Sequence, residues 1–130
     1  MYKHLGDYRG DLVALNELYR KAGNVKELFE PVLKGVFPGA WVSNMLVSLD
    51  PRTTLSVHTD PPLHAGTYRY HLVLRSNPWS WVWHDGEFDQ LHVGGIFVMD
   101  PAKQHFSVNA GEEPRVHLVI DMVGHPNLEV

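Results

Sequence analysis

Apolar residues in the first third of the chain recur at the spacing of α-helices. Residues 8–21 predict a first helix, because side chains three or four positions apart lie on one helical face. The members of that face are Leu12, Leu15, Leu18 and Tyr19. Asp11 is placed to cap the start of this helix and Gly23 to end it. A second amphipathic helix is expected over residues 25–36, where Pro31 must lie in the first turns or kink the helix.

After Pro38-Gly39 the pattern changes to short runs rich in β-branched and aromatic residues, which are typical of β-strands. Turn residues such as Asn77-Pro78 and Gly94-Gly95 separate these runs. The expected strands cover residues 41–49, 54–58, 68–75, 79–83, 88–92, 96–100, 105–108 and 115–122. This succession predicts a mainly β fold, a jelly roll or small barrel, with both helices packed outside the sheet.

Length and composition fit one compact domain. The 130 residues, 44% of them hydrophobic, suffice for a single core. We expect one domain over residues 1–130, with a helical N-terminal part (1–38) and a β core (39–126). No stretch approaches the roughly 20 apolar residues of a membrane span, and residues 1–10 lack the apolar centre of a signal peptide. A soluble, cytoplasmic protein without a membrane partner is therefore expected.

Charge and cysteine content exclude several classes of function. Eleven Lys and Arg stand against fifteen Asp and Glu, which gives a net charge of -4 and lacks the basic surface of a nucleic-acid binder. The absence of cysteine excludes disulfides, thiolate zinc sites, iron–sulfur clusters and cysteine nucleophiles. Nine histidines remain, and eight of them lie between His58 and His125. The chemistry is therefore expected in the last two thirds of the chain.

His58 and Asp60 form the most informative local motif, at the end of a predicted strand. In extended chain, residues two apart point to the same face, so the imidazole and the carboxylate would project together. With His105, which opens a later strand, they would supply the two histidines and one carboxylate typical of non-heme Fe(II) oxygenases. The alternative is that His58 and Asp60 are only a hydrogen-bonded pair in a surface turn.

Two further strands carry cationic residues among apolar neighbours. Arg115 opens the last long strand, where a buried guanidinium would require an anion such as the carboxylate of a small dicarboxylic acid. The alternative is an exposed Arg115 that pairs with Glu112 or Glu113. In the strand over residues 68–75, alternation places Arg69, His71 and Val73 on one face, which either lines a cavity or faces solvent.

From about Ser48 to Pro126 the chain resembles the aspartyl/asparaginyl β-hydroxylase family of Fe(II)- and 2-oxoglutarate-dependent oxygenases. The matching segments occur in the order of the family's motifs. They are Asp50 to Leu55 followed by His58-Thr59-Asp60, Arg69-Tyr70-His71-Leu72, Gly95 to Asp100, His105 with Asn109, and Arg115 to Asp121 with His125-Pro126.

The resemblance implies a double-stranded β-helix that uses Fe(II), O₂ and 2-oxoglutarate to hydroxylate an unactivated C–H bond, with release of succinate and CO₂. It implies that His58 and His105 hold the iron, that Arg115 anchors the far carboxylate of 2-oxoglutarate, and that His71 and Arg69 help to position cosubstrate or substrate. The family's animal namesakes have glycine at the position of Asp60. Here Asp60 restores the full metal triad, as in bacterial relatives that hydroxylate free amino acids.

Two alternatives remain open at this stage. The substrate is either a small molecule such as a free amino acid or an amino-acid side chain in a peptide. A non-catalytic, cupin-like barrel that binds a metal or small ligand is the rival to an enzyme. For Trp79, Trp81 and Trp83, we expect packing under the helices or in a dimer contact rather than a role in substrate binding. The loop over residues 61–66 is a candidate lid, and the oligomeric state is not predicted.

Overall fold

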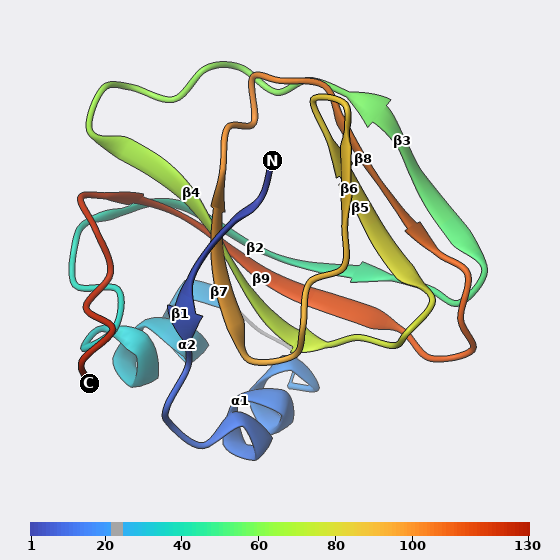
Figure 1. Ribbon diagram of the computed structural model, residues 1–130. Helices are drawn as coiled ribbons and strands as arrows, with labels where there is room; N and C mark the ends of the chain where they lie inside the picture. The colour runs from blue at the N-terminus through green and yellow to red at the C-terminus, as the bar shows by residue number, and fades with distance from the viewer. Residues whose placement is uncertain (22–24) are drawn as a thin grey trace.

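The computed structural model describes residues 1–21 and 25–130, so Gly23, the expected helix end, lies outside the described residues. The helices are α1 (Leu12–Tyr19) and α2 (Val25–Leu33). The strands are β1 (Lys3–Asp7), β2 (Trp41–Leu49), β3 (Thr53–His58), β4 (Thr67–Arg75), β5 (Ser80–His84), β6 (Glu87–Asp89), β7 (Gly95–Met99), β8 (His105–Asn109) and β9 (Arg115–Val123) (Figure 1).

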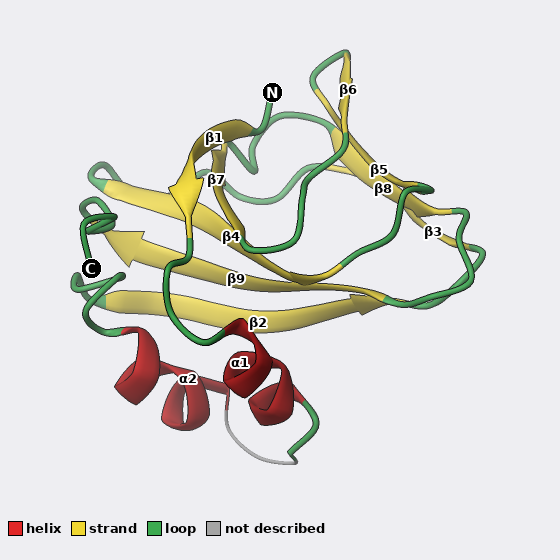
Figure 2. Cartoon of the chain, turned by 60° about the horizontal axis from the view of Figure 1, so that its bottom comes forward, coloured by secondary structure: helices red, strands yellow, loops and turns green. Residues whose placement is uncertain are grey.

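The strands form two antiparallel sheets. One has five strands in the order β1-β7-β4-β9-β2, and the other has four in the order β3-β8-β5-β6. Both helices lie against one side of the five-stranded sheet, and the four-stranded sheet lies on its other side (Figure 2). The prediction of a mainly β protein with two helices packed outside the sheet is thus confirmed. The five-stranded sheet forms a middle layer, with a different environment on each face.

Alternation along β4 and β9 assigns their side chains to these two environments. On the helix side, Tyr70, Leu72 and Leu74 of β4 join the core that contains Leu15 of α1 and Leu33 of α2. Each fully buried side chain of this size contributes about 1.5–3 kcal/mol of hydrophobic stabilisation. The opposite face carries Arg69 and His71 of β4 together with Arg115, His117 and Asp121 of β9. Residues of that polar face line the same cavity as His58 and His105 of the second sheet, so the polar face is turned toward that sheet.

Both helices are shorter than their periodicity predicts. Asp11 caps α1 as expected and accepts a hydrogen bond from the backbone N–H of Ala14 at 3.1 Å. Tyr8 instead belongs to an extended segment, and its N–H donates to the carbonyl of Gly94 at 2.8 Å. Pro31 lies inside α2 rather than in its first turn. Apolar periodicity therefore located the helices, while hydrogen bonds to neighbouring segments set their ends.

The helical N-terminal part expected over residues 1–38 also contains a strand that was not predicted, because β1 precedes the helices and pairs with β7. β1 alternates poorly and contains a glycine, so its short polar sequence gives little β-strand signal. The strand expected over residues 88–92 is also shorter than predicted, since β6 ends at Asp89. Both are edge strands, whose structure depends on a single neighbour in the described sheets.

Trp79, Trp81 and Trp83 do not lie under the helices, so that part of the expectation is wrong, while a dimer contact stays a prediction. Trp81 and Trp83 belong to β5 of the four-stranded sheet, and both are at least partly exposed. Trp83 stacks on Phe106 of β8 with ring centroids 5.3 Å apart.

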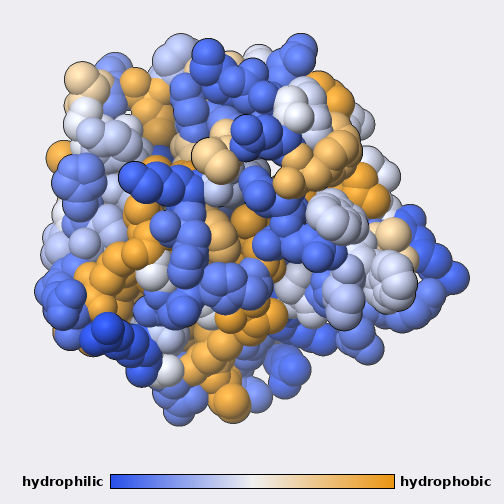
Figure 3. Space-filling model, viewed as in Figure 1, coloured by the Kyte–Doolittle hydropathy of each residue, from blue (hydrophilic) through white to orange (hydrophobic). Residues whose placement is uncertain are grey.

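Neither helix in the described residues has the length and apolar character of a membrane span. Hydrophobic and hydrophilic residues are mixed over the face seen in Figure 3.

Candidate metal centre

The structure brings His58, Asp60 and His105 together at the end of the four-stranded sheet. His58 ends β3 and faces His105, the first residue of β8, in the antiparallel register. The Oδ2 atom of Asp60 lies 3.9 Å from Nε2 of His58 and 3.4 Å from Nε2 of His105. One ligand atom from each residue falls within 4.8 Å of the others. This geometry is compatible with three ligands on one side of a metal ion.

Backbone carbonyls orient both imidazoles of this cluster. Nδ1 of His58 lies 2.6 Å from the carbonyl oxygen of Ser56, and Nδ1 of His105 lies 2.8 Å from that of Lys103. A carbonyl can only accept, so Nδ1 carries the proton in each ring and Nε2 presents its lone pair to the cluster. Burial also lowers the pKa of His105, which favours the neutral form that binds metal.

Arg69 donates hydrogen bonds to the carboxylates of both Asp60 and Asp121. Its Nη1 donates to Oδ2 of Asp60 at 2.8 Å, while its Nε and Nη2 donate to the two carboxylate oxygens of Asp121 at 2.8 and 3.0 Å. The bond to Asp121 raises the pKa of Arg69. Asp121 was not predicted as a site residue, although its position on β9 two residues beyond Val119 places it on the polar face. The immediate partners of Arg69 are therefore two carboxylates of the protein itself.

Arg115 is buried without an acidic partner. Its side chain is 4% exposed, and within the described residues it forms no ion pair and no hydrogen bond; its buried Nε has no partner. The alternative of an exposed Arg115 that pairs with Glu112 or Glu113 is wrong, because Arg115 is buried and no described ion pair joins it to either residue. Glu113 instead lies 3.3 Å from Arg75. Burial lowers the pKa of Arg115 to about 10, and the nearby Tyr2 partly offsets this effect.

His71 and His117 form a second unusual feature of the same polar face. Nδ1 of His71 lies 3.1 Å from Nδ1 of His117, so one ring donates to the other. The opposite nitrogen of His71, Nε2, is buried and has no hydrogen-bond partner in the described residues. His117 is not among the site residues that the sequence predicts. Its place on the face of Arg115, two residues away in β9, was the signal in the sequence that it belongs here.

The metal cluster, Arg69, His71 and Arg115 share one small cavity between the two sheets, of about 90 Å³. It is lined by Tyr2, Met45, Val47, Leu55, His58, Asp60, Arg69, His71, Met99, His105, Ser107, Arg115 and Val119. A larger open groove of about 740 Å³ adjoins it and shares Arg69 and Met99. The loop over residues 61–66 supplies part of the wall of this groove, and the three tryptophans do not line it.

Acid is expected to destabilise the protein through the buried histidine pair. Burial lowers the pKa of His71 to about 3 and that of His117 well below its usual value, whereas both bind a proton near pH 6.5 after unfolding. The contribution of the two neutral histidines to the free energy of unfolding is complete above pH 6.5 and is lost as the pH falls below 6.5. Urea unfolding should show about 2–3 kcal/mol lost through His71 between pH 7 and pH 4.5. The His117→Gln variant should flatten this dependence; an unchanged slope would contradict the assignment.

The comparison with protein families agrees with the position of these groups in the chain. Residues 10–126 match the model of the family described as aspartyl/asparaginyl beta-hydroxylase. The match includes every residue of the three-member cluster, together with Arg69, His71 and Arg115. Strand β1 lies outside it. No curated protein gives a match to the chain.

Proposed function

The chain belongs to the aspartyl/asparaginyl β-hydroxylase family, and from this premise we propose that it is an Fe(II)- and 2-oxoglutarate-dependent dioxygenase. Its reaction hydroxylates an unactivated C–H bond of an amino acid or amino-acid side chain and releases succinate and CO₂. One observation carries the proposal: a two-histidine, one-carboxylate cluster shares a small cavity with a buried arginine that has no acidic partner in the described residues.

The strand connections support a double-stranded β-helix as the finer description of the fold. From β2 to β5 the chain passes back and forth between the two sheets, and it does so again from β6 to β9. The two sheets lie face to face (Figure 2). The metal cluster lines the cavity between them. This alternation is what a double-stranded β-helix requires, and it supports a single domain built around the cavity.

His58, Asp60 and His105 are the proposed ligands of the iron. Two neutral imidazoles and one carboxylate fit non-heme Fe(II) and leave coordination positions open for other molecules. When bound, the iron supplies activation of O₂ and of the C–H bond. Arg69 holds Asp60 in place through the hydrogen bond to Oδ2, and Asp121 fixes Arg69 in turn. The Nδ1–H bonds to the backbone keep both rings in the ligating tautomer.

Arg115 and His71 are the proposed binding site for the far carboxylate of 2-oxoglutarate. A planar guanidinium binds a carboxylate through two parallel hydrogen bonds, and burial makes such a pair strong. If His117 donates its Nδ1–H to His71, then His71 carries its own proton on Nε2 and offers a further donor. The partnerless Nε2 of His71 and Nε of Arg115 support this assignment. Tyr2 also lines the cavity, and its ring centroid lies 5.2 Å from that of His71.

The open groove beside Arg69 is the proposed substrate site. Its wall combines the loop over residues 61–66 with charged side chains that suit an amino acid's own charges, including Lys3, Asp100 and Lys103. The small cavity itself has room for little beyond the metal and a compact acid. A free amino acid or a single side chain fits this arrangement better than an extended peptide platform.

Anaerobic spectroscopy tests the proposed function. Fe(II) and then 2-oxoglutarate are added to metal-free protein, and the visible charge-transfer band of an iron-chelated keto acid is expected only when both are present. Succinate, which lacks the keto group, serves as the control and should give no band. Iron binding without the band would instead favour a non-catalytic metal-binding barrel. Appearance of the band justifies a screen of amino acids by O₂-dependent succinate release.

A further inference from the structure

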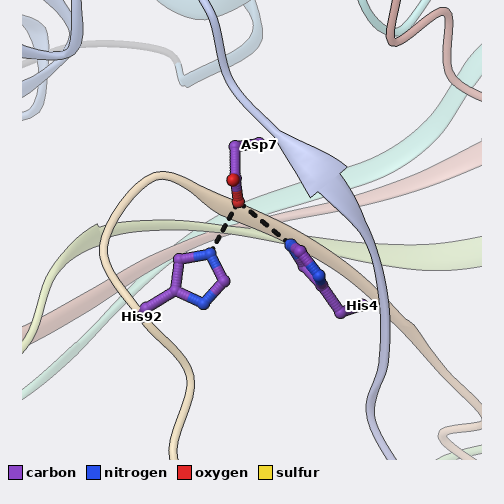
Figure 4. Close-up of side chains that lie close together, drawn as sticks. All are labelled: His4, Asp7 and His92. Atoms are coloured by element: carbon purple, nitrogen blue, oxygen red, sulfur yellow. Dashed lines mark hydrogen bonds and ion pairs between the residues drawn. The ribbon is translucent and has the colours of Figure 1, made fainter.

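A second group of two histidines and one carboxylate lies on the surface, away from the cavity. His4 and Asp7 come from β1, and His92 comes from the loop that precedes β7 (Figure 4). Nε2 of His4 lies 3.0 Å from Oδ1 of Asp7, and Nε2 of His92 lies 2.6 Å from the same oxygen. The three ligand atoms fall within 4.8 Å of one another. None of these residues lines the cavity.

A β-bulge places His4 and Asp7 on the same side of β1. Residues three apart in a regular strand point to opposite faces. Here His4 faces Phe97 and Asp7 faces Gly95, two residues apart on β7, and the register shifts between His4 and Gly6. The extra residue, Leu5, therefore changes the alternation and turns both polar side chains to one face.

Strand β7, which pairs with β1, has a glycine at the position where the ring of His92 lies close to the backbone. A Cβ on Gly95 would lie 2.9 Å from Nε2 of His92 and 2.5 Å from a ring carbon of Phe97, so only glycine leaves room for this arrangement. Both imidazoles pack on Phe97, with ring centroids 5.1 Å away for His4 and 5.5 Å for His92.

We propose that His4, Asp7 and His92 form a second metal site, which binds Zn²⁺ with water at the remaining position. Two imidazoles and one carboxylate are ligands that Zn²⁺ accepts in a tetrahedral site. Their Nε2 and Oδ1 atoms already converge, so binding requires only a small separation of atoms that now touch through hydrogen bonds. The absence of cysteine leaves nitrogen and oxygen as the donors, which the surface cluster provides.

Zinc at this site would fasten the N-terminal strand to the body of the protein. β1 is an edge strand that pairs with β7 alone in the described sheets. The proposed ion joins it to the loop before β7, which adds a bond between segments more than 80 positions apart in the chain. Tyr2, just before β1, lines the cavity. Zinc at this site would therefore stabilise the strand that directly follows Tyr2, a residue of the cavity wall, without contacting the reacting groups.

Calorimetric titration with Zn²⁺ alone tests this site, with variants that separate it from the cavity. The wild-type protein is expected to bind two equivalents, the His92→Asn variant one and the His105→Asn variant one. A variant with both substitutions should bind none. His64→Asn, which removes an exposed histidine from neither cluster, is the matched control and should retain two equivalents. His4→Asn provides an independent replacement on β1 and should behave like His92→Asn.

The outcomes separate this proposal from the proposed function. If wild-type protein binds one equivalent and His92→Asn binds none, the surface site is supported and the cavity site is not. If His92→Asn and His4→Asn bind as much Zn²⁺ as wild type, the surface site is refuted whatever happens at His105. As a second readout, Zn²⁺ should raise the Tm of the His105→Asn protein and leave that of the double variant unchanged.

Discussion

The Arg115→Met variant is expected to change ligand affinity and protein stability in opposite directions. Removal of a buried guanidinium that binds a carboxylate should cost about 3 kcal/mol, which corresponds to roughly a 100-fold higher KM for 2-oxoglutarate. The ligand-free variant should nevertheless be more stable, because Arg115 is a buried cation without an acidic partner in the described residues. A gain of about 1–2 kcal/mol, or a Tm increase of roughly 5 °C, is expected.

These two effects are measured by succinate release at increasing 2-oxoglutarate concentration and by thermal unfolding without ligand. Fe(II) affinity should be retained, since Arg115 is not among the proposed ligands. Arg20→Met is the matched control, because Arg20 is exposed and forms its ion pair with the equally exposed Glu17. An unchanged KM would refute the assignment of Arg115 to the cosubstrate. A lower Tm would show that the guanidinium stabilises the ligand-free fold.

The Asp60→Ala variant is expected to lose iron binding and turnover while keeping its fold. Loss of a hydrogen-bond partner of a metal ligand already costs about 10- to 100-fold in affinity or activity, so loss of a ligand itself should reduce turnover at least about 100-fold. The fold should persist because Arg69 keeps its two hydrogen bonds to Asp121. Iron titration, succinate release and the Tm measure these three properties separately.

Asp50→Ala controls for the loss of a carboxylate near β3, since Asp50 is exposed at the turn between β2 and β3. It should retain wild-type iron affinity. Hydroxylation at the wild-type rate in Asp60→Ala would mean that Asp60 is not a ligand and that the two histidines suffice. A collapse of the Tm would instead show that Asp60 serves chiefly to balance the charge of Arg69.

Features set by local geometry were predictable from the sequence. Alternation in β4 separates Arg69, His71 and Val73 from Tyr70, Leu72 and Leu74, and the structure confirms this division. The convergence of His58 with Asp60 follows from the same rule, since only one residue separates them. The exact match of β2 with residues 41–49 reflects a long run of β-forming residues between two turns.

Features that depend on long-range register were not predictable. Arg69 meets Asp121 only because β4 pairs with β9 in a particular alignment, across 52 positions of sequence. The pairing of His71 with His117 depends on the same alignment. β1 escaped prediction because its bulge interrupts the alternation that identifies strands. A single sequence constrains which face a residue occupies far more strongly than which strand lies beside it.

Because Arg115 has no acidic partner in the described residues, the net charge around the cavity depends on which ligands are bound. Arg69 and Arg115 balance Asp60 and Asp121, so the formal charges of these four side chains sum to zero. A divalent cation alone would leave an excess of two positive charges in a space of about 90 Å³, and a dicarboxylate alone an excess of two negative ones. Bound together, they restore the balance. Each should therefore tighten the binding of the other, by equal factors.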